Sequence, residues 1–241
     1  MKVFSATDVG QIRKMNQDFI FTSVEPVGNL PNLFIVADGM GGHNAGDYAS
    51  RYSVSVMIDT IKEDQNTNPV KILRAGIEAA NTAVLEKSLS EDRLRGMGST
   101  MVAAVVAGDV VYVANVGDSR LYIADDHLHQ VTQDHSLIAE MVRLGELTPE
   151  EGANHPDKNI ITRAVGTSEE IKIDFFDFKP EQDSVFMMCS DGLYNMVEET
   201  VIYQVLKDDQ VENKAGKLVQ LANAGGGLDN IAVVVVEPFS D

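Results

Sequence analysis

At 241 residues the chain is long enough to bury a sizeable core, and its 44% hydrophobic and 23% charged residues are typical of a soluble globular protein. Its 19 Lys and Arg against 37 Asp and Glu give a net charge of −18, which argues against nucleic acid or an anionic membrane as a partner because both attract basic surfaces. The same charge repels phosphorylated ligands at long range, so an anion site here needs local cations.

Cysteine content and the terminal sequence indicate where the chain works. The single cysteine, Cys189, lies in an apolar run, so we expect a buried thiol and no disulfide framework. The N-terminal residues lack the apolar core of a signal peptide, and no run reaches the ~18 apolar residues of a membrane span. We therefore expect a cytoplasmic protein with no membrane insertion. No linker or repeated surface stripe is visible, so we expect a single domain, residues 1–241, acting as a monomer.

The first predicted elements are short strands at residues 3–9 and 19–24, separated by a polar, Gly-led loop. Taken alone, such a loop favours a solvated turn. The functional alternative is that Arg13 presents its guanidinium to an oxyanion while Asp18 faces a cation.

A strand buried on both faces is predicted at residues 33–37, because this run is continuously apolar. It ends at Asp38 and Gly39, and four glycines fall within residues 39–46. His43 adds a side chain that can exchange a proton near neutral pH. An isolated Asp-Gly after an apolar run is more often a hairpin turn than a site.

Two helices and a series of strands follow. The apolar pattern predicts a helix over residues 45–63, and Asn68 with Pro69 supplies the start signal of a second helix. From Gly98 the sequence predicts an antiparallel meander of short strands at residues 99–107, 110–116, 120–124 and 128–131.

The last third of the chain mixes helices and strands. Residues 136–165 begin with a predicted helix and contain the capping box that starts at Thr148. We interpret them as an insertion with little core of its own, of the kind that often forms mobile lids. The remaining predicted elements are strands at 185–189 and 231–236 and helices at 198–206 and 214–224.

Four carboxylates recur next to Gly or Asn at predicted strand ends: Asp38, Asp118, Asp191 and Asp229. If the strands are neighbours, these side chains converge on one sheet edge, where they cannot all stay ionised without a cation. Oxygen ligands without Cys or several His residues favour Mg²⁺ or Mn²⁺ over zinc. Two such ions ~3.5–4 Å apart are the usual arrangement for phosphoester hydrolysis.

Eight short motifs cover essentially the whole chain: G-x-x-R-x-x-N-Q-D (10–18), V-A-D-G-M-G-G-H-x-x-G (36–46), G-S-T (98–100), N-V-G-D-S-R (115–120), Q-D-H-S-L (133–137), I-T-R-A-V-G (161–166), S-D-G-L (190–193) and D-N-I (229–231). Their combination and order resemble the metal-dependent serine/threonine protein phosphatases, the PPM or type 2C family, and especially its small bacterial members.

The resemblance implies an α+β fold, a four-layer sandwich of two antiparallel β-sheets flanked by α-helices, with a flap near residues 136–165. It also implies two Mn²⁺ or Mg²⁺ ions, with Asp38 bridging them and the carbonyl of Gly39 binding the second. Asp191 and Asp229 would hold the first ion, and Asp118 with Asp191 would hold a third, weaker one.

The same resemblance implies the remaining roles. Arg13 would bind the substrate phosphate, and water activated between the metals would attack phosphorus directly. His43 would protonate the departing alkoxide. Asp18 would act through metal-bound water, with Asn230 behind the ligands. The expected substrates are phosphorylated proteins, including a bacterial serine/threonine kinase and its targets.

Two alternatives remain open. One is a catalytically silent binding module that kept the fold, although such a protein should have lost a ligand and none is missing here. The other is a phosphatase with the same chemistry, specialised for a regulator of sporulation or of a sigma factor. The sequence does not distinguish Mn²⁺ from Mg²⁺ in the cell.

Overall fold

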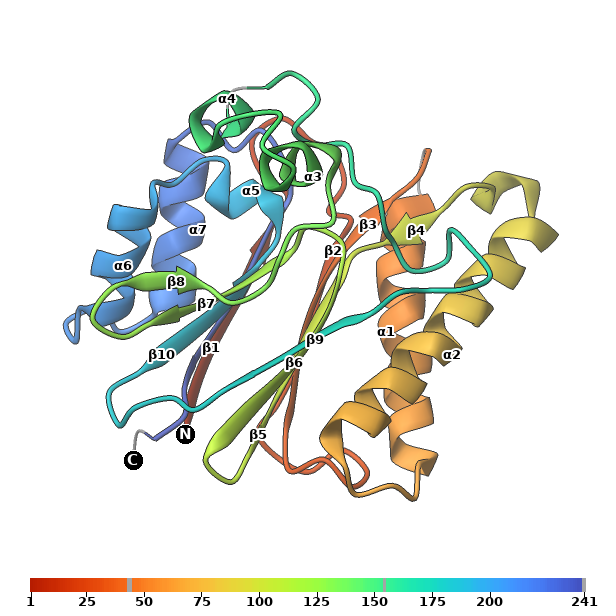
Figure 1. Cartoon of the computed structure of the whole chain (residues 1–241), viewed down its shortest axis with the longest axis horizontal. Coiled ribbons are helices and arrows are strands. Elements are labelled where there is room, and N and C mark those ends of the chain that lie inside the picture. The colour runs from red at the N-terminus through yellow and green to blue at the C-terminus, as the bar shows by residue number, and fades with distance from the viewer. Residues whose placement is uncertain (43–44, 154, 240–241) are drawn as a thin grey trace.

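Two antiparallel β-sheets face each other and helices cover both outer faces (Figure 1). The computed structural model describes residues 1–42, 45–153 and 155–239. This arrangement confirms the α+β sandwich expected from the sequence. No helix in the described ranges is both long and apolar enough to cross a membrane.

The first sheet contains both the first and the last strand of the chain. Its order is β1 (Lys2–Asp8), β11 (Ile231–Glu237), β10 (Val185–Cys189), β7 (Arg120–Ala124) and β8 (Leu128–Gln130). Its outer face packs against α6 (Glu199–Lys207) and α7 (Lys214–Ala224).

The second sheet has the order β2 (Asp18–Ser23), β3 (Leu33–Met40), β5 (Met101–Ala107), β6 (Val110–Val116) and β9 (Asp174–Phe178), and the short β4 (Gly98–Ser99) also pairs with β3. The helices α1 (Ala45–Glu63) and α2 (Pro69–Ser90) cover its outer face, and the 3₁₀ turn η1 (Asp92–Leu94) follows them.

The strands are apolar on both faces because each face meets a different layer. In β3, Leu33 and Ile35 belong to the core beneath α1 and α2, whereas Phe34 and Val36 belong to the core between the sheets. Phe34 meets Phe186 of β10 edge to face across that central layer, at 6.2 Å between ring centroids. The doubly buried strand predicted at 33–37 is thus confirmed.

The helix start signals read from the sequence are also confirmed. Asn68 is the N-cap of α2 and its side chain accepts the backbone N–H of Lys71, with Pro69 in the first turn. Thr148 and Glu151 form the reciprocal capping box that begins α4 (Pro149–Ala153).

The meander predicted for residues 99–131 is wrong at one connection. β5 and β6 pair as expected, but β7 pairs with β8 and β10 in the opposite sheet. The chain crosses between the sheets at Gly117–Ser119, where Gly117 has φ +104° and a Cβ would lie 2.7 Å from the side chain of Thr100. This crossing brings Asp118 to the end of the sandwich.

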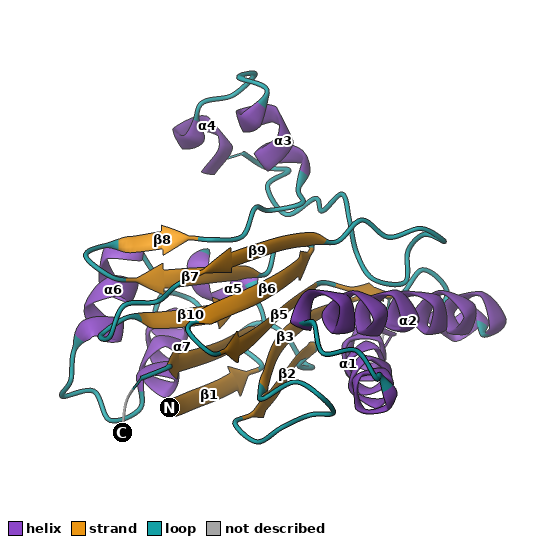
Figure 2. Ribbon diagram, turned by 60° about the horizontal axis from the view of Figure 1, so that its bottom comes forward, coloured by secondary structure: helices purple, strands orange, loops and turns teal. Residues whose placement is uncertain are grey.

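The insertion at 136–165 contains α3 (Leu137–Arg143) and α4, which stand apart from the two sheets (Figure 2). The two helices pack on each other, and α3 buries little beyond Ile138. The segment returns to the sandwich at Val165, which is fully buried and hydrogen-bonds to Ser99 of β4.

Candidate active site

Two carboxylates face each other across β2 and β3. Asp18 and Asp38 are direct cross-strand partners, and Asp18 is only 2% exposed. Burial raises the pKa of Asp18 to about 7. Burial, together with the charges of Asp18 and Asp191, raises the pKa of Asp38 well above its usual value. Since like charges directly opposite each other repel, this pair favours a bound proton or a bound cation.

Three more carboxylates reach the same place from the other sheet. Arg120 and Cys189 are partners at the end of the β7–β10 pair. Asp118 lies two residues before Arg120, and Asp191 lies two residues after Cys189, where it begins α5 (Asp191–Tyr194). Burial, followed by the charges of Asp118 and Asp229, raises the pKa of Asp191 to about 8. Asp229 immediately precedes β11 through Asn230.

These side chains do not share one sheet edge, so the arrangement expected from the sequence is wrong in this respect. Asp18 and Asp38 belong to the second sheet, whereas Asp191 and Asp229 adjoin strands of the first. The carboxylates therefore meet where the ends of the two sheets come together. A cation at this point would link the two halves of the sandwich.

The donor set fits a hard divalent cation. Asp18 Oδ1 and Asp191 Oδ1 are buried and have no hydrogen-bond partner, which is costly for an oxygen that water cannot reach. Within the described residues, no three Asp, Glu, His or Cys side chains already adopt a geometry that could hold one ion. Protein donors engage two of the carboxylates instead. Arg13 Nη2 lies 2.7 Å from Asp229 Oδ2, and Ser190 Oγ lies 2.5 Å from Asp18 Oδ2.

The loop that carries Arg13 is tied to the loop before β11. The side-chain amide of Asn230 donates to the carbonyls of Val9 and Met15, and its oxygen accepts the N–H of Gln17. These bonds fix the loop from both ends while the Arg13 side chain stays 51% exposed. Residues 11–15 are exposed, as expected of the solvated turn favoured for this segment alone, but the loop is also held beside the acidic cluster.

Glycine is required where these loops approach each other. A Cβ on Gly39 would lie 1.9 Å from the carbonyl oxygen of Gly46, and a Cβ on Gly192 would lie 1.9 Å from that of Asn230. Neither contact is possible for another residue without moving backbone. The glycines beside Asp38 and Asp191 thus let neighbouring segments close around the carboxylates.

Hydroxyl groups behind the carboxylates connect the strands that carry them. Thr100 Oγ1 accepts the N–H of Asp38 at 2.9 Å and shares a 2.7 Å hydrogen bond with Ser119 Oγ. Ser190 Oγ accepts the N–H of Ala232 while it donates to Asp18. Asp38 is therefore linked to the Asp118 turn, and Asp18 to β11.

A buried histidine joins the base of the flap to the same turn. The N–H of Gly117 donates to His135 Nδ1 at 3.0 Å, so Nε2 carries the hydrogen and donates to Asp174 at 3.0 Å. Arg163 Nη1 donates to the other oxygen of Asp174 at 2.9 Å. Burial lowers the pKa of His135, which favours this neutral form.

The chain is similar to known proteins in sequence and in fold. The family described as "Protein phosphatase 2C" matches residues 11–215. The chain belongs to the protein phosphatase 2C family. It is 42% identical to "Serine/threonine phosphatase stp" of Listeria monocytogenes, over 96% of this chain and 93% of that protein.

Solved structures of phosphatase 2C relatives share the fold. The S. agalactiae serine/threonine phosphatase has a TM-score of 0.89 and 38% identity, covering 97% of this chain and 98% of that one. The catalytic domain of the serine/threonine phosphatase PstP, in complex with two manganese ions, has a TM-score of 0.85 and 30% identity, covering 97% and 96%.

For this phosphatase 2C chain, the structure brings together most of the residues singled out from the sequence. Asp18, Asp38, Asp118 and Asp191 influence one another electrostatically, and Asp229 joins them through its pair with Arg13. His43 lies outside the described residues.

Sequence reasoning missed the groups that hold the carboxylates. Thr100 and Ser190 were noted only as members of short motifs, with no role assigned. His135 likewise lies inside a quoted motif without an assigned role, and Tyr194 lies just outside one. Their only local signal is that each lies within four residues of a candidate ligand or inside a family motif.

Proposed function

We propose that the chain hydrolyses phosphoserine and phosphothreonine esters in proteins, using divalent cations bound at the acidic cluster. The observation that carries this proposal is the convergence of five carboxylates from both sheets, two of which have buried oxygens without a partner. A protein gains nothing from burying so much like charge unless a cation or a reaction depends on it.

The proposed ligands follow the assignments made from the sequence. Asp38 and the carbonyl of Gly39 would hold one ion, with Asp38 shared by a second ion that Asp191 and Asp229 also bind. Asp118 with Asp191 would hold a third, weaker ion. Bound Mn²⁺ or Mg²⁺ would supply charge neutralisation and a lowered pKa for water.

The side chains of the protein would position the substrate. Arg13 is half-exposed at the edge of the cluster, and its planar guanidinium suits two phosphate oxygens. It supplies local positive charge that a net charge of −18 otherwise lacks. Asn230 would keep the Arg13 loop in place through its three backbone hydrogen bonds.

Two residues would manage protons. His43 is proposed as the general acid that protonates the departing Ser or Thr oxygen. Asp18, which receives a hydrogen bond from Ser190, would accept a hydrogen bond from water on its unpaired oxygen.

The substrates are proposed to be phosphoproteins, among them a serine/threonine kinase and its targets. We further propose that residues 1–241 act as one domain, as a monomer, in the cytoplasm. Phosphoproteome comparison with and without the protein would identify the substrates and test the specialised-regulator alternative.

The experiment that tests the chemistry compares a chromogenic aryl phosphate and a phosphothreonine peptide with added Mn²⁺, with added Mg²⁺ and with a chelator. We expect hydrolysis of both substrates with the metals and none with the chelator. Re-addition of Mn²⁺ to the chelated sample controls for denaturation. Activity that is indifferent to chelation would reject the proposal.

A further inference from the structure

Arg120 is a mostly buried arginine, and each of its three guanidinium nitrogens donates a hydrogen bond inside the protein. Its Nε and Nη2 bind both oxygens of Asp134, at 2.7 Å for the shortest contact, and Nη1 donates to Tyr122 Oη at 2.7 Å. The side chain is 20% exposed and that of Asp134 13%. These contacts hold the guanidinium in one position within the protein.

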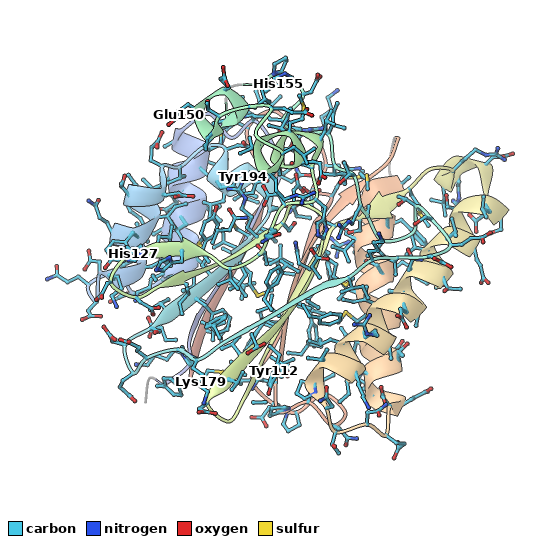
Figure 3. The ribbon with its side chains drawn as sticks, in the orientation of Figure 1. Tyr112, His127, Glu150, His155, Lys179 and Tyr194 are labelled. Atoms are coloured by element: carbon cyan, nitrogen blue, oxygen red, sulfur yellow. The ribbon has the colours of Figure 1, made fainter. Side chains whose placement is uncertain are left out.

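The face of the guanidinium lies on an aromatic ring. Arg120 Cζ is 3.6 Å from the centroid of the Tyr194 ring, a close cation–π contact. Because the Asp134 fork fixes the plane of the guanidinium, it also fixes the plane of the ring. Figure 3 shows Tyr194 near the end of the sandwich beneath the flap helices.

Tyr194 contacts both segments that carry the weaker cation's proposed ligands. Its hydroxyl donates to the backbone carbonyl of Asp118 at 3.1 Å. It is also the last residue of α5, the four-residue helix that Asp191 begins. One rigid ring therefore connects the Asp118 turn with the Asp191 helix.

We propose that Arg120 and Tyr194 are a positioning pair that sets the distance between Asp118 and Asp191 and thereby the affinity of the third cation. This inference rests on the proposed function. Two carboxylates on separate segments bind one ion well only if their separation is held before the ion arrives, because ordering them afterwards lowers the affinity. Asp118 is proposed to bind the third ion alone, whereas Asp191 also binds an ion that Asp38 and Asp229 hold through supports of their own. We therefore expect the largest effect at the third ion.

Tyr194→Phe is the sharpest test because it removes one hydroxyl and keeps the ring under Arg120. Tyr203→Phe is a matched control. The hydroxyl of Tyr203 donates to the carbonyls of Asp125 and Asp126, each at 3.0 Å, in the β7–β8 turn away from the cluster. Arg120→Lys keeps the charge but loses the fork and the stacked plane.

Titration of the metal-free proteins with Mn²⁺, followed by calorimetry and by electron paramagnetic resonance of free Mn²⁺, separates strong from weak sites. We expect Tyr194→Phe to weaken the weakest site about threefold to tenfold, as loss of one hydrogen bond predicts, with the tight sites within about twofold of wild type. Arg120→Lys should weaken the same site further, and Tyr203→Phe should change none. Higher Mn²⁺ should refill the weakened site.

Three outcomes would overturn the inference. The first is a Tyr194→Phe protein whose weakest site is unchanged. The second is equal weakening of every site, which would indicate general damage to the fold. The third is wild-type protein that binds no Mn²⁺, which would overturn the proposed function as well. The first two outcomes would overturn only the positioning role of Arg120 and Tyr194, so the two failures can be distinguished.

Discussion

Asp38 lies at the centre of the acidic cluster, opposite Asp18 and within reach of the charges of Asp118, Asp191 and Asp229. Asp38→Asn keeps the size of the side chain and removes its charge. Removing a group that only supports a metal ligand typically lowers metal affinity or activity about 10- to 100-fold. Loss of the ligand itself should have a larger effect, so we expect kcat to fall by more than about 100-fold. Steady-state hydrolysis of an aryl phosphate with Mn²⁺ measures this.

The matched control is Asp177→Asn, because Asp177 is an exposed aspartate on β9. It should keep wild-type kcat. In chelator the Asp38→Asn protein should also unfold at no lower temperature than wild type, since the variant removes a carboxyl whose ionised form is disfavoured by burial and by neighbouring carboxylates. Wild-type kcat for Asp38→Asn would contradict the proposed ligand set.

Arg13 is the second residue with a role open to a direct test. Arg13→Ala should raise KM for a phosphopeptide about 10- to 100-fold, the usual size of a lost hydrogen bond to a charged group, with a smaller change in kcat. Lys14→Ala removes an exposed neighbouring cation and should change KM little. An unchanged KM for Arg13→Ala would argue against phosphate binding by this side chain.

At this scale the sequence could predict the carboxylates but not their supports. Asp38 and Asp191 follow apolar strands and precede glycine, and both features are local. Thr100, Ser190 and Tyr194 act on carboxylate-bearing segments that are 62, 172 and 76 residues away along the chain, respectively. No local pattern encodes such pairings.

At the scale of elements, Thr100 joins the strand that carries Asp38 to the turn that crosses between the sheets. Thr100→Val should lower the free energy of unfolding by about 1–3 kcal/mol, because the buried N–H of Asp38 loses its acceptor. It should also lower kcat, since Asp38 would shift. Denaturant unfolding in chelator measures the first effect separately from the second.

Thr82→Val is the control, since the exposed Thr82 on α2 bonds only within its own helix, to the carbonyl of Glu78. Its free energy of unfolding should stay within about 0.5 kcal/mol of wild type, as for most surface substitutions. Equal stability of the two variants would mean that the Thr100 hydroxyl does not hold Asp38.

The sequence predicted elements best where start signals were strong. The predicted bounds of α1 and α7 are confirmed, as is the start of α2 at Asn68 and Pro69. The strand β9 was not predicted, because Asp174–Phe178 has no clear alternation and gains its order from pairing with β6. The crossing at Gly117 was also missed, since a turn and a change of sheet look alike in sequence.

For the molecule as a whole, the acidic cluster makes stability depend on pH. In the native protein the pKa values of Asp118, Asp18 and Asp191 are raised by burial and neighbouring charges from 3.8 to about 6, 7 and 8, and the pKa of Asp38 is also raised well above its usual value. The native state therefore binds more protons than the unfolded chain between about pH 4 and pH 8, and stability falls as pH rises through that range.

In chelator, we expect the melting temperature to fall from about pH 5 to about pH 8. Burial lowers the pKa of His135, and this shift makes stability rise with pH. The effect of this single histidine should be smaller than that of the four aspartates with raised pKa values. Saturating Mn²⁺ should reduce or reverse the fall, because it binds the ionised carboxylates of the native state. Calorimetric scans at several pH values measure this dependence. In the Asp191→Asn variant the melting temperature should depend less steeply on pH. A melting temperature that rises with pH in chelator would contradict the prediction.

The position of β11 has a consequence for how the protein is made. β1 has β11 as its only strand neighbour in the described sheet, and Asp229 and Asn230 come just before β11. On a ribosome, the earliest strand must wait for residues 231–237 before it can join a sheet. A partly synthesised chain therefore has an incomplete set of carboxylates and an incomplete first sheet. We expect phosphatase activity to appear only after β11 has been translated.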